Sequence, residues 1–168
     1  MKVESNKNRL RIVGVDPGLT RSGWGIVDYA RGQVSLVDFG TIATTTKLEF
    51  PARLAKIYAE LQAVTEKFQP DFFAVEDVIY AANVKIALKL GHARGSILLV
   101  AAHNRIPVAS YSPKEIKQSV TGNGNASKDQ VQRMVQVILN TDALKTFHDV
   151  SDALAAAICH ANRVKFER

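Results

Sequence analysis

The sequence contains very little cysteine: Cys159 is the only one in 168 residues. A single cysteine cannot form an intramolecular disulfide, and it cannot build a zinc site that needs several thiolates. Cys159 lies in the apolar run ALAAAIC, which favours a buried, inert thiol over a nucleophile. Disulfide crosslinks and cysteine-bound zinc are therefore excluded as the basis of the fold or its chemistry.

Long hydrophobic runs are also absent. No stretch is long and apolar enough to cross a membrane, and the first nine residues, MKVESNKNR, lack the apolar core of a signal peptide. Acidic residues are fewer than basic ones, 16 against 22, so the formal net charge is +6. We therefore expect a cytoplasmic protein whose partner is a polyanion, either a nucleic acid or a membrane surface.

The length suits one domain with a sizeable core. The hydrophobic content of 46% and the charged content of 23% are typical of globular proteins. No linker, internal repeat or low-complexity segment interrupts the chain. We expect a flexible tail over residues 1–9 and a single domain over residues 10–168.

Short apolar runs separated by turns open the domain. The run from Leu10 to Val15 stops at Asp16-Pro17-Gly18 and predicts a buried strand. Two further β-rich runs, 24–29 and 33–44, are separated by Arg31-Gly32, which indicates an antiparallel hairpin. Three consecutive strands are therefore expected.

From Pro51 the apolar period changes to three and four residues, which predicts an amphipathic helix that ends at Gln69-Pro70. This order of elements indicates one α/β domain built on a mixed sheet. The remaining elements are expected to be a strand over 72–78, a helix over 83–103, a strand over 108–112, a short helix from Pro113, a helix capped by Ser127, and a last helix over about 149–162.

Two glycines lie inside the helix predicted over 83–103. Gly91 and Gly95 each cost about 1 kcal/mol relative to alanine in a helix interior. Such glycines usually permit a close backbone approach. Packing within the chain and a helix–helix contact between two copies of the chain are equally compatible with them.

Four acidic residues fall at positions where a carboxylate needs a partner. Asp16 ends the first strand and Glu76 interrupts an apolar strand, so burial of either is costly unless it is paired or binds a cation. Asp149 and Asp152 are three residues apart and share one face of the last helix. Considered alone, these acids also have structural explanations. For Asp149 and Asp152, the explanation is that carboxylates in the first turn of a helix compensate the helix dipole.

Together the four acids favour a metal site. Oxygen ligands without cysteine suit Mg²⁺ or Mn²⁺, and two such ions can activate a water and stabilise the leaving oxygen in phosphodiester hydrolysis. His148, next to Asp149, is either a ligand or proton shuttle, or a surface residue. Lys117 and Lys128 flank the glycine-rich loop 122–127 and are either phosphate contacts or solvated side chains.

Several motifs in this order resemble the RuvC family of crossover junction endodeoxyribonucleases, over about residues 10–162. They are VGVDPG followed by T-x-x-G, VED, ALKLGHARG, IKQSVTGNGNASKDQVQ and DVSDALAAAICH. The resemblance implies a ribonuclease H-like fold with a five-stranded mixed sheet flanked by helices. It also implies a Mg²⁺-dependent homodimer that resolves Holliday junctions in DNA recombination and repair, in cooperation with the RuvA–RuvB branch-migration complex.

Residue roles follow from the resemblance position by position. It assigns catalysis and metal binding to Asp16, Glu76, Asp149 and Asp152, and DNA binding to Lys117 and Lys128. The family often has an aromatic residue three positions after the strand glutamate, near the junction centre. Here Ile79 occupies that position and Tyr80 follows it, so either Tyr80 substitutes as a DNA contact or the wedge is aliphatic.

Other functions are compatible with parts of this pattern. An actin-like ATPase shares D-x-G-x-T, but it needs two such domains around a nucleotide, which 168 residues cannot supply. A general ribonuclease H-like nuclease would cut linear duplex as readily as junctions. A non-catalytic junction-binding module would use the acids only structurally, and metal-dependent cleavage separates it from an enzyme.

Overall fold

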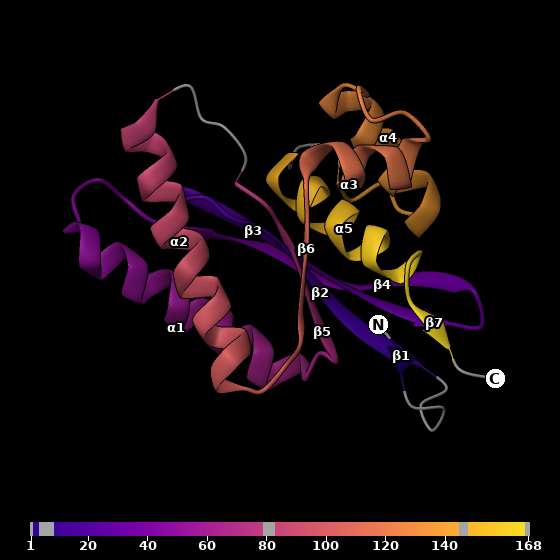
Figure 1. The fold of residues 1–168 in the computed structure, drawn as a ribbon, viewed down its shortest axis with the longest axis horizontal. Helices are drawn as coiled ribbons and strands as arrows, with labels where there is room; N and C mark the ends of the chain where they lie inside the picture. The colour runs from indigo at the N-terminus through magenta and orange to yellow at the C-terminus, as the bar shows by residue number, and fades with distance from the viewer. Residues whose placement is uncertain (1, 4–8, 79–82, 145–147, 167–168) are drawn as a thin grey trace.

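The structure is a computed structural model that describes residues 2–3, 9–78, 83–144 and 148–166 (Figure 1). Its centre is a five-stranded sheet with the strand order β4-β3-β2-β5-β6. β2, β3 and β4 are antiparallel, whereas β5 and β6 run parallel to β2, so the predicted mixed sheet is confirmed. The strands are β2 (Leu10–Asp16), β3 (Arg21–Ala30), β4 (Gln33–Ala43), β5 (Phe72–Glu76) and β6 (Val108–Tyr111).

Helices cover both faces of the sheet (Figure 1). Among the described residues, no helix combines the length and apolarity that crossing a membrane requires. The first face carries α1 (Phe50–Phe68) and α2 (Val84–His103), and the second carries α3 (Pro113–Thr121), α4 (Lys128–Leu139) and α5 (His148–Ala161).

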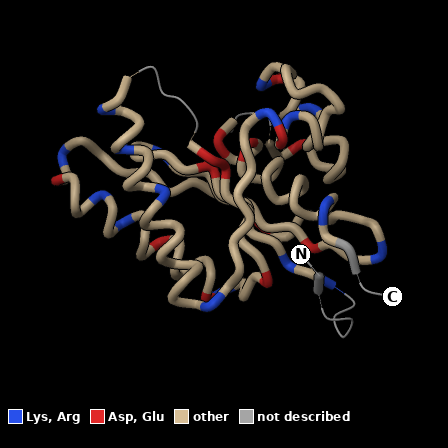
Figure 2. The backbone as a smooth tube through the Cα atoms, in the orientation of Figure 1, with Lys and Arg blue, Asp and Glu red and all other residues tan. Residues whose placement is uncertain are grey.

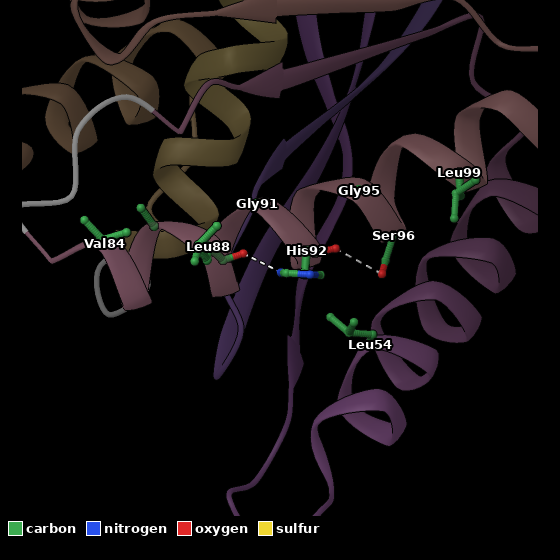
Figure 3. A pocket seen from close by; sticks show the side chains of 9 residues that line it. Leu54, Val84, Leu88, Gly91, His92, Gly95, Ser96 and Leu99 are labelled. Carbon is green, nitrogen blue, oxygen red and sulfur yellow. Dashed lines mark hydrogen bonds between the residues drawn. The ribbon is translucent and has the colours of Figure 1, made fainter.

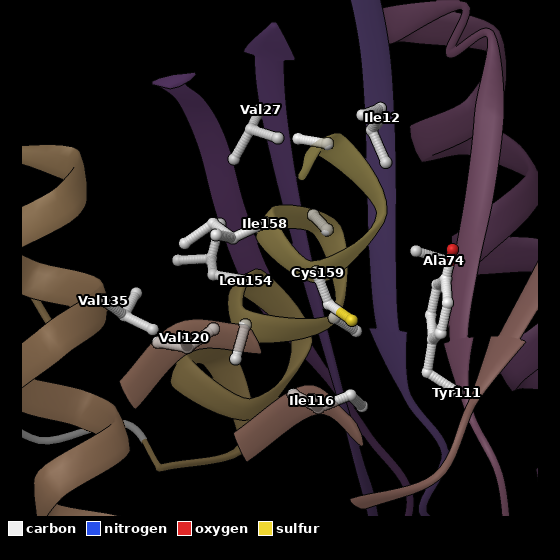
Figure 4. Close-up of a cluster of buried hydrophobic side chains, with 14 of the residues drawn as sticks. Ile12, Val27, Ala74, Tyr111, Ile116, Val120, Val135, Leu154, Ile158 and Cys159 are labelled. Carbon is white, nitrogen blue, oxygen red and sulfur yellow. The ribbon is translucent and has the colours of Figure 1, made fainter. Parts of the chain in front are cut away.

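The alternation of side chains along the central strand divides the core in two. Leu10 and Ile12 of β2 pack with α5, whereas Val13 and Val15 pack with α1 and α2. Figure 4 shows Ile12 and Ala74 on the side of Leu154 and Cys159. Even-numbered positions of β2 therefore face α5.

Local chemistry explains where the helices begin. Ser112 and Ser127 each cap a helix through a reciprocal capping box, with Glu115 and Gln130 as the respective partners. Pro51 lies in the first turn of α1, where its missing N–H leaves no helical bond unmade. The prediction of Ser127 as an N-cap is confirmed.

The two ends of the described chain meet. Lys2–Val3 (β1) pairs in parallel with Lys165–Phe166 (β7), apart from the main sheet. Residues 4–8 lie outside the described residues. The division of the chain into a flexible tail and one domain therefore stays a prediction.

Gly91 and Gly95 lie on α2 beside the α1 residue Leu54 (Figure 3). A Cβ atom added at either glycine would meet no atom of the described chain within 4 Å. Close packing within the chain, one of the two explanations compatible with the sequence, is therefore wrong. The other explanation, a helix–helix contact between two copies of the chain, stays a prediction.

The backbone of α5 lies directly on β2 and β3. A Cβ atom added at Gly14 would lie 1.9 Å from the Ala153 carbonyl oxygen, and one added at Gly23 would lie 2.0 Å from the Asp149 carbonyl oxygen. The alanine-rich sequence of α5 leaves the helix slim enough for this approach. The first turn of α5 is thereby held over the end of β2.

We expect the substitution Gly14→Ala to destabilise the protein by about 3 kcal/mol, at the upper end of overpacking costs, because the clash is with backbone atoms. Urea unfolding followed by circular dichroism measures this change. An unfolding midpoint equal to that of the wild type would contradict the close approach of α5.

Candidate active site

Asp16 and Glu76 lie at the same edge of the sheet and on the same face. β2 and β5 are parallel neighbours, with Val15 opposite Val75, so the strands end side by side. Asp16 shares its face with Ile12, and Glu76 shares its face with Ala74, both of which pack against α5. Figure 2 shows acidic residues gathered where these strand ends meet the helices of that face.

Asp149 and Asp152 reach the same edge from the first turns of α5. Asp152 is the more buried: its side chain is 18% exposed, against 35% for Asp149. Asp152 therefore faces into the protein more than Asp149 does. Four acidic side chains from three elements therefore converge, as the sequence predicts.

The titration of Asp16 and Glu76 reflects this convergence. Burial raises the pKa of Asp16 to about 8, and the charges of the other three acids act in the same direction. Burial also raises the pKa of Glu76 to about 7, with Asp152 adding to the effect. The site therefore holds an excess of negative charge that favours binding of a cation.

Basic side chains lie at the edge of this acidic group. Lys128 Nζ is 3.2 Å from Asp152 Oδ2, and the Asp152 charge raises the pKa of Lys128. The Lys117 charge lowers the pKa of Glu76, so this lysine also lies nearby. Both lysines that the sequence singles out thus border the acids.

Sequence reasoning missed Arg21, whose Nε lies 3.8 Å from Asp149 Oδ2. No periodicity identifies this contact, because it joins the beginning of β3 to a helix more than a hundred residues later. The proximity of Arg21 to the DPG turn was the only available signal.

Asp77, adjacent to Glu76, serves a different purpose. Its carboxylate accepts a 2.7 Å hydrogen bond from Arg94 of α2, on the opposite face of the sheet. Glu76 and Asp77 therefore point to opposite sides of the sheet. Arg94 also donates to Ser110 of β6, so it joins the end of β5 to α2 and β6.

The donor set suits a hard divalent cation, because all four candidate ligands are carboxylates. Within the described ranges, no three His, Cys, Asp or Glu side chains are already arranged to hold one ion. Asp149 and Asp152 instead form ion pairs with Arg21 and Lys128.

The sequence singles out four other positions: His148, Ile79, Tyr80 and Cys159. His148 is exposed at the start of α5, and its role stays a prediction. Ile79 and Tyr80 lie outside the described residues, so Tyr80 as a DNA contact also stays a prediction. Cys159 is buried and burial raises the pKa of its thiol, as expected of an inert cysteine.

Comparison with known proteins places this arrangement in a family. The family model "Crossover junction endodeoxyribonuclease RuvC" matches residues 12–160. The RuvC protein of Ruminiclostridium cellulolyticum is 44% identical over 151 residues, which cover 90% of this chain and 91% of the relative. The chain belongs to the RuvC family of crossover junction endodeoxyribonucleases, which is metal-dependent.

Solved structures agree with this assignment. Thermus thermophilus RuvC in complex with a Holliday junction superposes with a TM-score of 0.84 and 32% identity, covering 90% of this chain and 93% of that one. The yeast mitochondrial Holliday junction resolvase, at 15% identity and a TM-score of 0.64, shares the fold. The predicted ribonuclease H-like architecture is confirmed.

We expect the metal-free protein to lose stability as the pH rises from 6 to 9. The pKa values of Asp16 and Glu76 in the fold, about 8 and 7, exceed their ordinary values of 3.8 and 4.5. Protonation therefore favours the folded state, and this stabilisation disappears as the pH rises through 7 and 8. A loss of at least about 1.4 kcal/mol, equivalent to one pKa unit, should appear in urea unfolding with EDTA.

The variant Asp16→Asn is the control, and its stability should depend less on pH over this range. His160, whose pKa burial lowers to about 4, affects both proteins equally at lower pH. Added Mg²⁺ should stabilise the wild type more at pH 9 than at pH 6, because metal binding requires ionised carboxylates. Identical pH profiles for the two proteins would contradict the coupled acidic site.

Proposed function

We propose that this chain, as a homodimer, resolves Holliday junctions by paired symmetric nicks that leave 5′-phosphate and 3′-hydroxyl ends. The observation that carries the proposal is the convergence of four carboxylates at the end of β2 in a member of this nuclease family. Two Mg²⁺ ions per site, with Mn²⁺ as a substitute, are the proposed cofactors. The proposed catalytic and metal-binding residues are Asp16, Glu76, Asp149 and Asp152.

Asp16 occupies the centre of the site. Burial is the largest cause of the raised pKa of Asp16, and the charges of Glu76, Asp152 and Asp149 all add to it. Burial is also the largest cause of the raised pKa of Glu76, to which the charge of Asp152 adds. Asp16 would be the central ligand of the set, and Glu76, Asp152 and Asp149 would hold the ions together with it. Bound divalent ions supply Lewis-acid stabilisation of the attacking and leaving oxygens of a phosphodiester.

The lysines bring the DNA backbone to the acids. Lys128 is 67% exposed although it contacts Asp152, so its ammonium can also reach a phosphate from solvent. Lys117 lies on α3, close enough to influence Glu76. Two cations beside the acids would hold a phosphate against the repulsion of the carboxylates. Tyr80 remains the proposed contact near the junction centre.

Dimerisation follows from the symmetry of the reaction, because two opposed strands must be cut and a two-fold dimer presents two identical sites. The face of α2 around Gly91 and Gly95 is the proposed interface. It is apolar and open: Val84, Leu88 and Leu99 are 72%, 59% and 53% exposed. These side chains point away from the core (Figure 3).

The proposal also includes two points of cellular context. Cooperation with the RuvA–RuvB branch-migration complex would supply junctions for cleavage. A cytoplasmic location would place the enzyme with chromosomal DNA.

We expect Asp16→Asn to reduce junction cleavage by at least about 1,000-fold, because the substitution removes an anionic metal ligand. The Kd for the junction should change little, because the asparagine side chain keeps the shape of the aspartate side chain. A labelled mobile four-way junction and a matched linear duplex are incubated with Mg²⁺, and binding is measured in EDTA. The matched control is Asp38→Asn, because Asp38 lies on β4 and pairs with Lys67.

Each outcome of this experiment separates the candidate functions. Symmetric nicks in the junction alone, lost in Asp16→Asn, are the expected result. Equal cutting of linear duplex would indicate a general ribonuclease H-like nuclease. Binding without cleavage in any metal would indicate a junction-binding module, and normal cleavage by the variant would remove Asp16 from the mechanism.

We expect Leu88→Glu to convert the dimer into monomers, because it places a charge in the proposed apolar interface. Sedimentation equilibrium at micromolar concentration measures the mass. Val137→Glu is the control, since Val137 is also an exposed apolar residue but lies on α4. A wild-type monomer, or a dimer that persists in Leu88→Glu, would contradict this interface.

A further inference from the structure

Arg53 is a buried cation outside the acidic group. It lies at the beginning of α1, and only 8% of its surface is exposed. Its hydrogen-bond partners in the described chain are neutral oxygens, and no carboxylate there forms an ion pair with it. A positive charge near a helix N-terminus also opposes the helix dipole. Both features are unfavourable, so the position needs an explanation.

The hydrogen bonds of Arg53 converge on the turn that follows Asp16. Nη2 donates to the Leu19 carbonyl oxygen at 3.1 Å and to Thr20 Oγ1 at 3.3 Å. Nε donates to Thr44 Oγ1 at 3.0 Å, and the Thr44 hydroxyl in turn donates to the Leu19 carbonyl oxygen. The Thr44 backbone N–H donates to the Thr20 carbonyl oxygen at 2.8 Å. Arg53 and Thr44 thus bind the same two residues.

This turn joins two parts of the active site. Residues 17–20 connect β2, which ends at Asp16, to β3, which begins at Arg21. Arg21 lies beside Asp149. One end of the turn therefore adjoins Asp16 and the other end adjoins the partner of Asp149. A second link, between the Ser22 hydroxyl and both backbone groups of Gly18, closes the turn. A displacement of residues 19 and 20 would therefore move Asp16 and Arg21 together.

We propose that Arg53 is a positioning residue for catalysis, which fixes the 17–22 turn from the opposite face of the sheet and so aligns Asp16 with Asp149. This inference rests on the proposed role of the four acids. The planar guanidinium is required because it donates to a carbonyl and two hydroxyls in fixed directions. A lysine at this position keeps the charge but not the directions.

The first test compares Arg53→Lys with the wild type in single-turnover cleavage of a bound junction. We expect the cleavage rate to fall about ten- to a hundred-fold, as small misplacements of reacting groups do. The Kd for the junction, measured in EDTA, should change by less than about three-fold, since Arg53 is buried and offers DNA almost no surface. An unchanged rate in a folded Arg53→Lys protein would overturn the proposal.

Arg11→Lys is the matched control. Arg11 is also an arginine with three or more hydrogen bonds, to Asp28 and the Phe68 carbonyl oxygen, but it lies at the opposite end of β2 from Asp16. The Arg11→Lys substitution should lower the melting temperature of the protein without slowing junction cleavage. Equal slowing in Arg11→Lys and Arg53→Lys would mean that general destabilisation is responsible, and would overturn the proposal.

A measurement without DNA follows metal binding directly. The rise in melting temperature caused by Mg²⁺ at pH 8 should be smaller for Arg53→Lys than for Arg11→Lys, because only the former displaces Asp16. If Arg53→Lys fails to fold, Thr44→Val decides the question: it removes a hydroxyl that binds Arg53 and Leu19 and keeps the side-chain volume. Wild-type cleavage and metal response in Thr44→Val would then overturn the proposal.

The proposed role of the four acids and the proposed role of Arg53 can be refuted separately. Normal cleavage by Asp16→Asn would refute the role of the acids whatever Arg53 does. An inactive Asp16→Asn beside a fully active Arg53→Lys would leave the acids in place and refute only the positioning role.

Discussion

The backbone contact between α5 and the central strands determines the geometry of the site. Gly14 and Gly23 leave no room for a side chain, and the alanines of α5 allow the helix to lie against β2 and β3. This contact carries Asp149 and Asp152 to the edge where Asp16 and Glu76 end their strands. A bulkier residue at the contact would separate helix from sheet, and with them the two halves of the acidic group.

The same convergence has an energetic cost. Two partly buried carboxyls with raised pKa values and two more acids nearby repel one another when ionised, and the ion pairs of Lys128 and Arg21 offset this only in part. The proposed site of catalysis therefore coincides with the site of electrostatic repulsion, as in many enzymes whose function opposes stability. The well-packed cores on both faces of the sheet hold the acids in place despite this repulsion.

The sequence predicts much of this arrangement, because apolar periodicity is local. The period of two marks the strands, the period of three to four marks the helices, and the acids stand out as charges in apolar runs. The roles of Arg21, Arg53 and Arg94 could not be predicted from the sequence, because their contacts are not local. Their partners, Asp149, Thr20 and Asp77, come from distant elements, and a surface arginine has the same local pattern. Gly91 and Gly95 were ambiguous because the sequence does not show which face of a helix is covered.

The pairing of Lys2–Val3 with Lys165–Phe166 has a practical consequence. Both ends of the described chain lie at one corner, beside the beginning of β2, whereas Asp16 ends that strand (Figure 1). Six residue steps of about 3.3 Å separate the ends of the strand by about 20 Å. An affinity tag, a fluorophore or a surface tether at either terminus would therefore leave the acidic edge free, and the nuclease could be immobilised without blocking its own substrate.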